Sequence, residues 1–132
     1  MPSSNYESIT AEASTNLGAN AGYIVKVTNA NELQLAAAAT TVPKGIIETA
    51  RNAVGGECNV VLSGFAHVIV GATFTAGTTT PAFMSDAAGK AIPFVADASN
   101  YKVGELINSH KDLAAGDVCA CIVNIGTLDT QN

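Results

Sequence analysis

Short runs rich in β-branched and aromatic residues recur along most of the chain, and turn-forming residues separate them. Runs of this length and composition, bounded by Gly, Asn, Asp, Ser and Pro, are typical of β-strands. Their regular spacing predicts a compact single domain that is mainly β, a sandwich or barrel with little helix. The expected strands cover residues 23–27, 33–35, 45–48, 58–70, 83–84, 91–95, 103–108 and 118–125.

Three segments have a less regular pattern. The long run at 58–70 contains Gly64, which indicates a bulge or a close backbone approach within one strand or a bent pair. Four alanines at 36–39 have high helix propensity, but Pro43 follows closely, so we expect a strand and then a turn. Residues 109–115 are expected to hold one short helical turn.

The chain carries one pattern of residues twice. The first glycine of the pattern precedes the turn glycine by 11 residues in one copy (45 to 56) and by 12 in the other (104 to 116). Because the spacing recurs, we predict two related halves in one pseudo-symmetric domain; solenoid arrays generally need at least three repeats. We expect the halves to superpose glycine on glycine. The matching pieces are Gly45, 55–57 and 60–62 with Gly104, 115–117 and 120–122, and more weakly 25–30 with 82–87, within halves of about 22–70 and 77–126.

Residues 1–21 differ from the rest of the chain. They are small and polar, without useful helical or strand periodicity, so we interpret them as an extended N-terminal arm outside the core of a β-rich domain at 22–132. Such an arm can add a strand to a neighbour's sheet edge, where main-chain bonds supply affinity and side chains fill pockets. A disordered tail is the alternative. Deletion of residues 1–17 is expected to leave a folded core.

The charge of the chain limits its partners. Charged residues make up 13% of the 132 residues, and the net charge is −5 with only six Lys and Arg. Nucleic-acid affinity depends mostly on Lys and Arg, so we expect no nucleic-acid partner. No run approaches the length of a membrane-spanning helix, and no signal peptide is visible. We expect synthesis in the cytoplasm, no membrane partner, and a surface suited to contact with other chains; a weakly charged monomer is the alternative.

The titratable residues predict no metal site. Cys58, Cys119 and Cys121 are expected to be free buried thiols, and the last two should share one strand face. His67 lies in an apolar strand and His110 in a loop, with no zinc-type spacing to the cysteines.

The remaining motifs predict neither an enzyme nor a cofactor. Glu57 and Asp117 occupy equivalent turns, which explains them without an acid pair. The glycine-rich pieces at 18–22 and 55–56 lack the fingerprint of a phosphate-binding loop, and no G-x-S-x-G motif is present. A small hydrolase is therefore a weaker interpretation.

An ordered series of short motifs resembles the small capsid decoration proteins of tailed bacteriophages, of the lambda-like type. Each piece alone is common, and the specificity comes from their order over about 22–126. The chain departs from the pattern after Gly77, where relatives often place an acidic residue. The pieces are 22–27, 43–46, 56–57, 60–66, 75–77, 88–91, 103–106 and 115–117.

The resemblance implies a β-rich, β-tulip-like cement protein that forms homotrimers on the outer surface of the phage head. It implies that the protein stabilises the shell of major capsid protein, and that the arm grips that protein. We therefore expect capsid contacts from the arm and subunit contacts from some phenylalanines. The candidates are Tyr6, Ser8, Ile9, Thr10 and Leu17 in the arm, and Phe65, Phe74, Phe83 and Phe94 at subunit contacts.

A ligand- or carbohydrate-binding β-module of a fibre or adhesin is the alternative function. Sugar sites generally present exposed aromatic side chains, whereas this chain has no Trp and three Tyr, of which two lie in or near the arm. We therefore prefer the structural virion protein.

Overall fold

The computed structural model describes residues 6–107 and 111–126, which contain nine β-strands and no helix. The mainly β, single-domain fold class predicted from the sequence is confirmed. Each of the eight expected runs contains a strand, and one further strand precedes them. The strands are β1 (Tyr6–Glu12), β2 (Ile24–Val27), β3 (Leu33–Leu35), β4 (Gly45–Ala50), β5 (Glu57–Ile69), β6 (Ala82–Ser85), β7 (Ala91–Pro93), β8 (Lys102–Leu106) and β9 (Val118–Gly126).

Two of the irregular segments differ from expectation. The strand expected at residues 36–39 is absent, because β3 already ends at Leu35. These residues form a loop that leads into a turn. The expected helical turn at 109–115 is absent from the described part, 111–115, and the remainder lies outside the described residues together with His110.

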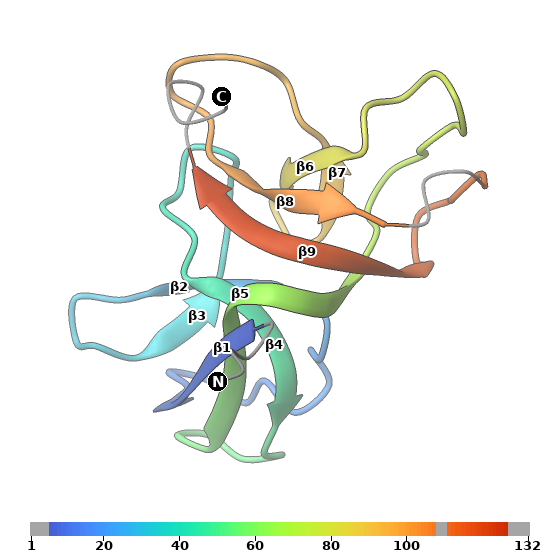
Figure 1. Ribbon diagram of the computed structural model, residues 1–132. Coiled ribbons are helices and arrows are strands. Elements are labelled where there is room, and N and C mark those ends of the chain that lie inside the picture. The colour runs from blue at the N-terminus through green and yellow to red at the C-terminus, as the bar shows by residue number, and fades with distance from the viewer. Residues whose placement is uncertain (1–5, 108–110, 127–132) are drawn as a thin grey trace.

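The strands form one curled sheet in the order β3-β2-β4-β5-β9-β8-β6-β7, and β1 pairs with β5. All of these strand pairings are antiparallel. In Figure 1, β5 and β9 run across the middle, with β6 to β8 above them and β1 to β4 below. The sheet therefore has two parts, which meet at β5.

The long strand β5 changes partners at Gly64. Its first part pairs with β1 and β4, and its last part pairs with β9 from Gly64 to Ile69. Gly64 has φ +97°, a conformation that side chains with a Cβ rarely adopt, so glycine is needed where the strand turns from one partner set to the other. The irregularity expected at this glycine is confirmed.

The two parts of the sheet are two copies of one five-stranded unit. The first unit consists of β1 to β4 and the first part of β5, and the second unit of the last part of β5 and β6 to β9. Away from the contact of β5 with β9, both have the same strand order, β5-β4-β2-β3 and β9-β8-β6-β7. In each unit the residue after the first strand makes a parallel bridge to the third strand, Ala13 to Leu33 and Val70 to Ala91. The two units have the strand order expected of a repeat, but the first unit begins at β1 and not near residue 22.

Backbone hydrogen bonds recur at matching positions, and they fix which residues are counterparts. A bond in the first unit and its copy in the second differ by 57 to 61 in residue number. The matched bonds are Ala13 N to Gly56 O (3.0 Å) with Val70 N to Asp117 O (2.8 Å), Ala36 N to Ile24 O (2.9 Å) with Phe94 N to Ala82 O (2.9 Å), and Ile47 N to Tyr23 O (2.9 Å) with Leu106 N to Pro81 O (2.8 Å).

One of the two expected glycine matches is correct. A Cβ built on Gly45 would lie 2.2 Å from Val61 O, and one on Gly104 would lie 2.1 Å from Ile122 O, so both glycines admit the same close strand approach. The turn glycines are offset by one residue, because Gly116 has φ +98°. Its counterpart is Gly55 at φ +76°, and not Gly56.

The weaker echo is also offset by one residue. Asn31 (φ +66°) and Gly89 (φ +81°) hold the same position in the β2–β3 and β6–β7 hairpins. Val25 therefore corresponds to Phe83, and not to Ala82; each of them pairs with the close-approach glycine of its unit.

The N-terminal segment is part of the first unit, which corrects the expectation that residues 1–21 lie outside the core. Ala13 and Leu17 are buried, Leu17 with 3% exposure. The first unit therefore starts at β1, well before residue 22, and its β1 holds the place that the last part of β5 holds in the second unit. Deletion of residues 1–17 would remove a whole strand, so it would not leave the core intact.

The buried side chains of the two units repeat position by position. The inner cluster of the first unit has a counterpart in the larger cluster at every position. Its members, each with its counterpart, are Ala13 and Val70, Leu17 and Phe74, Val25 and Phe83, Leu33 and Ala91, Ile47 and Leu106, Cys58 and Cys119, and Val60 and Cys121.

We predict that Leu17→Ala lowers the free energy of unfolding by about 2 to 5 kcal/mol, the range for truncating a buried leucine. Val54→Ala, at a side chain that is 77% exposed in the β4–β5 turn, is the control and should change it by about 0.5 kcal/mol or less. Urea unfolding followed by circular dichroism measures both. Equal, small effects of the two substitutions would show that the N-terminal segment does not contribute to the core.

A second prediction concerns the close approach at Gly104. Gly104→Ala should lower the free energy of unfolding by about 3 kcal/mol or more, since the new Cβ meets a backbone oxygen that cannot move without parting β8 from β9. Gly77→Ala is the control, at a site with φ +82° and open space around it, where only backbone strain of about 1 to 2 kcal/mol is expected. Thermal and urea unfolding compare them; a smaller loss for Gly104→Ala would contradict the steric account.

Candidate functional site

The proposed arm residues lie on β1 and just after it. Ser8 and Thr10 are exposed, and the Thr10 hydroxyl donates a hydrogen bond to Asn59 Oδ1 at 2.7 Å. Ile9 is half-buried on the opposite side of the strand. Leu17 is a core residue, so it is not available to another chain. Tyr6 pairs with Gly64 through its backbone, and its side chain lies outside the described residues.

The four phenylalanines divide into two groups. Phe74 and Phe83 are core residues with 2% and 0% exposure, so the expectation that they contact another subunit is wrong. Phe65 is exposed and Phe94 is half-buried. These two remain candidates for a contact between subunits.

An apolar groove opens beside β1, at the concave side of the first unit. It has a volume of about 480 Å³, and we call it the open groove. Val27 and Val42 in its wall are exposed, and Lys44 places a positive charge at its edge. The residues that line it are Ile9, Thr10, Ala11, Val27, Asn31, Leu33, Val42, Pro43 and Lys44.

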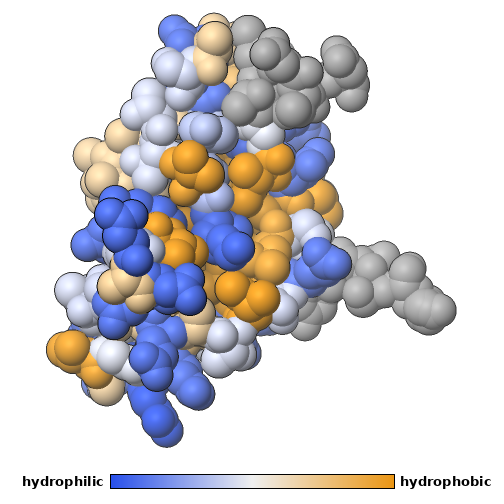
Figure 2. Space-filling view, turned by 90° about the vertical axis from the view of Figure 1, so that its left-hand side faces the viewer, coloured by the Kyte–Doolittle hydropathy of each residue, from blue (hydrophilic) through white to orange (hydrophobic). Residues whose placement is uncertain are grey.

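A second apolar surface covers the convex side of the second unit, and we call it the outer face of that unit. Phe65 on β5 pairs in register with Ile122 on β9, and Ile122 pairs with Glu105 on β8. Phe65 packs edge-on against His67, with ring centroids 5.1 Å apart. Figure 2 shows one side of the molecule, on which hydrophobic residues gather next to polar ones.

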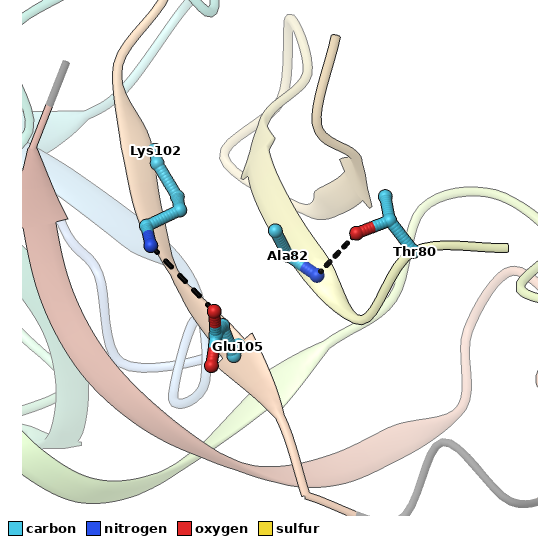
Figure 3. Close-up of polar contacts among 4 residues, drawn as sticks. All are labelled: Thr80, Ala82, Lys102 and Glu105. Carbon is cyan, nitrogen blue, oxygen red and sulfur yellow. Dashed lines mark hydrogen bonds and ion pairs between the residues drawn. The ribbon is translucent and has the colours of Figure 1, made fainter. Parts of the chain in front are cut away.

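Glu105 places a negative charge on the outer face. Glu105 forms an ion pair with Lys102 three residues earlier on β8, at 3.6 Å, and Figure 3 shows the pair beside Ala82 of β6. A hollow of about 380 Å³ borders the face, with Phe65, His67 and Val118 in its lining. Exposed apolar side chains that are contiguous on a folded surface are typical of sites that bind another protein.

The three cysteines are free and buried, as predicted, and Cys119 and Cys121 lie on the inner side of β9. Burial, and less strongly the neighbouring Cys119, raises the pKa of Cys121 from its ordinary 9.0 to about 12. Burial also raises the pKa of Cys58. The thiols of Cys58 and Cys121 are therefore protonated at neutral pH.

Among residues 6–107 and 111–126, no three His, Cys, Asp or Glu side chains are placed to hold a metal ion. The same part of the chain has no helix long and apolar enough to cross a membrane. A small polar hollow of about 270 Å³ lies over the end of the first unit, with Thr10, Arg51 and Glu57 in its lining.

The sequence signal for β1 was present but weak. Ile9, Ala11 and Ala13 point to one side of the strand, and polar residues alternate with them. Two of the three apolar residues are alanines, which are small and have no β-propensity, so the alternation was not evident.

Comparison with known proteins finds a similar fold among the solved structures. No known family profile matches the sequence, and no curated protein sequence is significantly similar to it. Among solved structures, the fold is similar to the crystal structure of the N base of the head fiber protein gp8.5 of bacteriophage phi29, with a TM-score of 0.61 and 19% identity. The match covers 90% of this chain and 94% of that chain. It shows a shared fold, and it does not support the lambda-like type suggested by the sequence motifs.

The buried thiol predicts how stability depends on pH. Because the pKa of Cys121 is higher in the folded state, the unfolded state ionises first and stability falls as pH rises from about 9 towards 12. Val60 is the counterpart of Cys121, so Cys121→Val should fold and should lose part of this decline. Urea unfolding at pH 7, 9 and 10 compares the two proteins. Parallel stability curves for both would contradict a role of this thiol.

Proposed function

We propose that this chain is a structural protein of a bacteriophage virion that sits on the outer surface of the head. The observation that supports this most directly is the fold likeness to the base of a phage head fibre over 90% of this chain and 94% of the other. The likeness spans the whole domain, so it is not a shared hairpin or a common substructure. The motif resemblance to decoration proteins points independently to the same location.

The finer proposal is that the protein binds the major capsid protein as a homotrimer and stabilises the shell. Two uncovered apolar surfaces, the open groove and the outer face of the second unit, supply contact area for other chains. Because only 13% of the residues are charged, burying these two surfaces in a contact removes few charges from water and is less costly. We propose no catalytic activity, no cofactor, and no nucleic-acid or membrane partner. The protein would be synthesised in the bacterial cytoplasm and assembled onto the head there.

The exposed side of β1 is the proposed contact with the capsid. Ser8 and Thr10 face outward there; Thr10 lies beside Asn59 of β5, and Ser8 pairs in register with Val61. Small polar residues on an ordered strand let another chain approach closely, and hydrogen bonds from their hydroxyls to that chain would offset the cost of burying them. In this proposal the capsid contact that the sequence assigned to a separate arm is made by the outward side of β1, a strand of the domain itself.

We predict that the protein co-sediments with mature heads of its own phage, and that bound protein raises the temperature at which heads rupture. The double variant Ser8→Arg/Thr10→Arg should bind at least about tenfold more weakly, because two bulky charged side chains obstruct the contact. Ala96→Arg/Ala98→Arg, in the exposed loop after β7, adds the same charge elsewhere and should bind like the unaltered protein.

The outcomes separate the parts of the proposal. Failure of the unaltered protein to bind heads would overturn the virion function and return the ligand-binding module to first place. Equal binding by both double variants would retain head attachment and overturn the contact through β1. Circular dichroism of each variant establishes that the fold is intact.

A further inference from the structure

The chain makes one large contact between its own units. In the first unit, Val25, Ile47 and Val60 point inward and belong to the inner cluster. One sequence neighbour of each, namely Ile24, Ile46 and Val61, points outward and belongs to the larger cluster. The outward residues belong to the cluster that fills the concave side of the second unit. The first unit therefore covers the opening of the second with its outer face. The residues that do so are Ile24, Ala36, Ile46 and Val61.

Backbone hydrogen bonds fasten this internal contact. The Ile24 amide donates to the carbonyl of Gly89, in the β6–β7 hairpin of the second unit, at 2.7 Å. The Tyr101 amide donates to the carbonyl of Ala39 at 2.9 Å. The contact is head-to-tail, because the outer face of one unit meets the concave side of the other and the two surfaces are different.

The concave side of the first unit has no such cover within the described residues. In the first unit, Ile9 is half-buried, and Val27 and Lys44 are exposed. In the second unit, the residues at the three corresponding positions are all buried. The open groove of about 480 Å³ lies at this place. The counterparts are Ala66, Ser85 and Val103.

The outer face of the second unit is likewise uncovered along β8 and β9. Val61 is 2% exposed and its counterpart Ile122 is 43% exposed, and the buried Ile46 corresponds to Glu105, whose side chain is 59% exposed. The Ala82 amide, counterpart of the Ile24 amide, donates only to the hydroxyl of Thr80 at 3.3 Å, as Figure 3 shows. Each half of the internal contact is thus present a second time without its partner.

We propose that the open groove of one copy receives the outer face of the second unit of another copy, in the arrangement that already joins the two units of one chain. Ile122, Phe94 and Ala82 of the incoming copy would take the places of Val61, Ala36 and Ile24. The carbonyl of Asn31, which corresponds to Gly89, would accept the Ala82 amide. The two surfaces carry opposite charges, Lys44 in the groove and Glu105 on the face. The corresponding residues of the internal contact are the apolar Val103 and Ile46.

Such a contact is heterologous, so it makes a ring if the rotation closes and a filament if it does not. The inference rests on the self-association in the proposed function, and names the surfaces that produce it. It does not depend on attachment to a head. Three copies would form a ring of six units in which covalent and non-covalent junctions alternate.

Mixing of two blocked variants tests the head-to-tail contact. Val42→Asp puts a charge in the open groove, Ile122→Lys puts one on the outer face, and both sites are exposed, so the fold should be retained. Val54→Lys alters an apolar side chain that belongs to neither surface and is the control. Light scattering coupled to size exclusion gives the mass of each sample over a range of concentrations.

The unaltered protein and Val54→Lys are expected to associate, and each blocked variant alone is expected to be monomeric. The equimolar mixture of the two blocked variants should form a dimer and stop there, because one intact groove meets one intact face. A mixture that stays monomeric would overturn the proposal, as would an unaltered protein that is monomeric up to about 1 mM. Unlimited growth of the unaltered protein would support the contact and overturn the ring of three.

Head binding and association are measured separately, so their failures can be distinguished. Association in solution without head binding would overturn the virion function and retain the contact. Head binding by a protein that never associates would retain the virion function and overturn the contact.

Discussion

The burial of both faces of the first unit's sheet is the constraint on which the rest of the structure depends. On one side its inner cluster fills its own concave interior, and on the other its outer face closes the second unit. Burying each of Ile24, Ile46 and Val61 contributes about 1.5 to 3 kcal/mol, so the three together contribute an amount comparable to the net stability of a small domain. The sharing of β5 sets the geometry, because its backbone runs through both parts of the sheet.

The sequence of the first unit reflects the burial of both faces of its sheet. Where a strand is buried on both sides, apolar residues are adjacent, as in Ile24-Val25, Ile46-Ile47 and Val60-Val61. In the second unit the counterpart of Ile46-Ile47 is Glu105-Leu106, with the polar residue on the uncovered side, whereas the counterparts of the other two pairs remain apolar. The chain thus distinguishes two otherwise equivalent units by what covers them.

Much of the fold could be predicted from the sequence, because turn glycines and β-branched runs are local signals. The repeat was found by its glycine spacing, but its register was off by one, since Gly55 and Gly56 are adjacent and only the left-handed turn position identifies the counterpart of Gly116. The candidate site was harder to predict. Phe74 and Phe83 could be distinguished from Phe65 only by the curl of the sheet, which no local pattern encodes. The N-terminal strand was missed because its inward side chains are mostly alanine.

The position of β5 in the chain has a consequence for synthesis. All strands of the first unit precede residue 64, so this unit is complete in sequence while the strands after β5 are still to be made. Domains generally fold as their N-terminal parts emerge from the ribosome, and exposed apolar surface makes a partly made chain prone to aggregate. For that interval the apolar residues that later close the second unit face water. A nascent chain that stalls after β5 therefore exposes this apolar face, and the speed with which β6 to β9 follow determines how long it stays exposed.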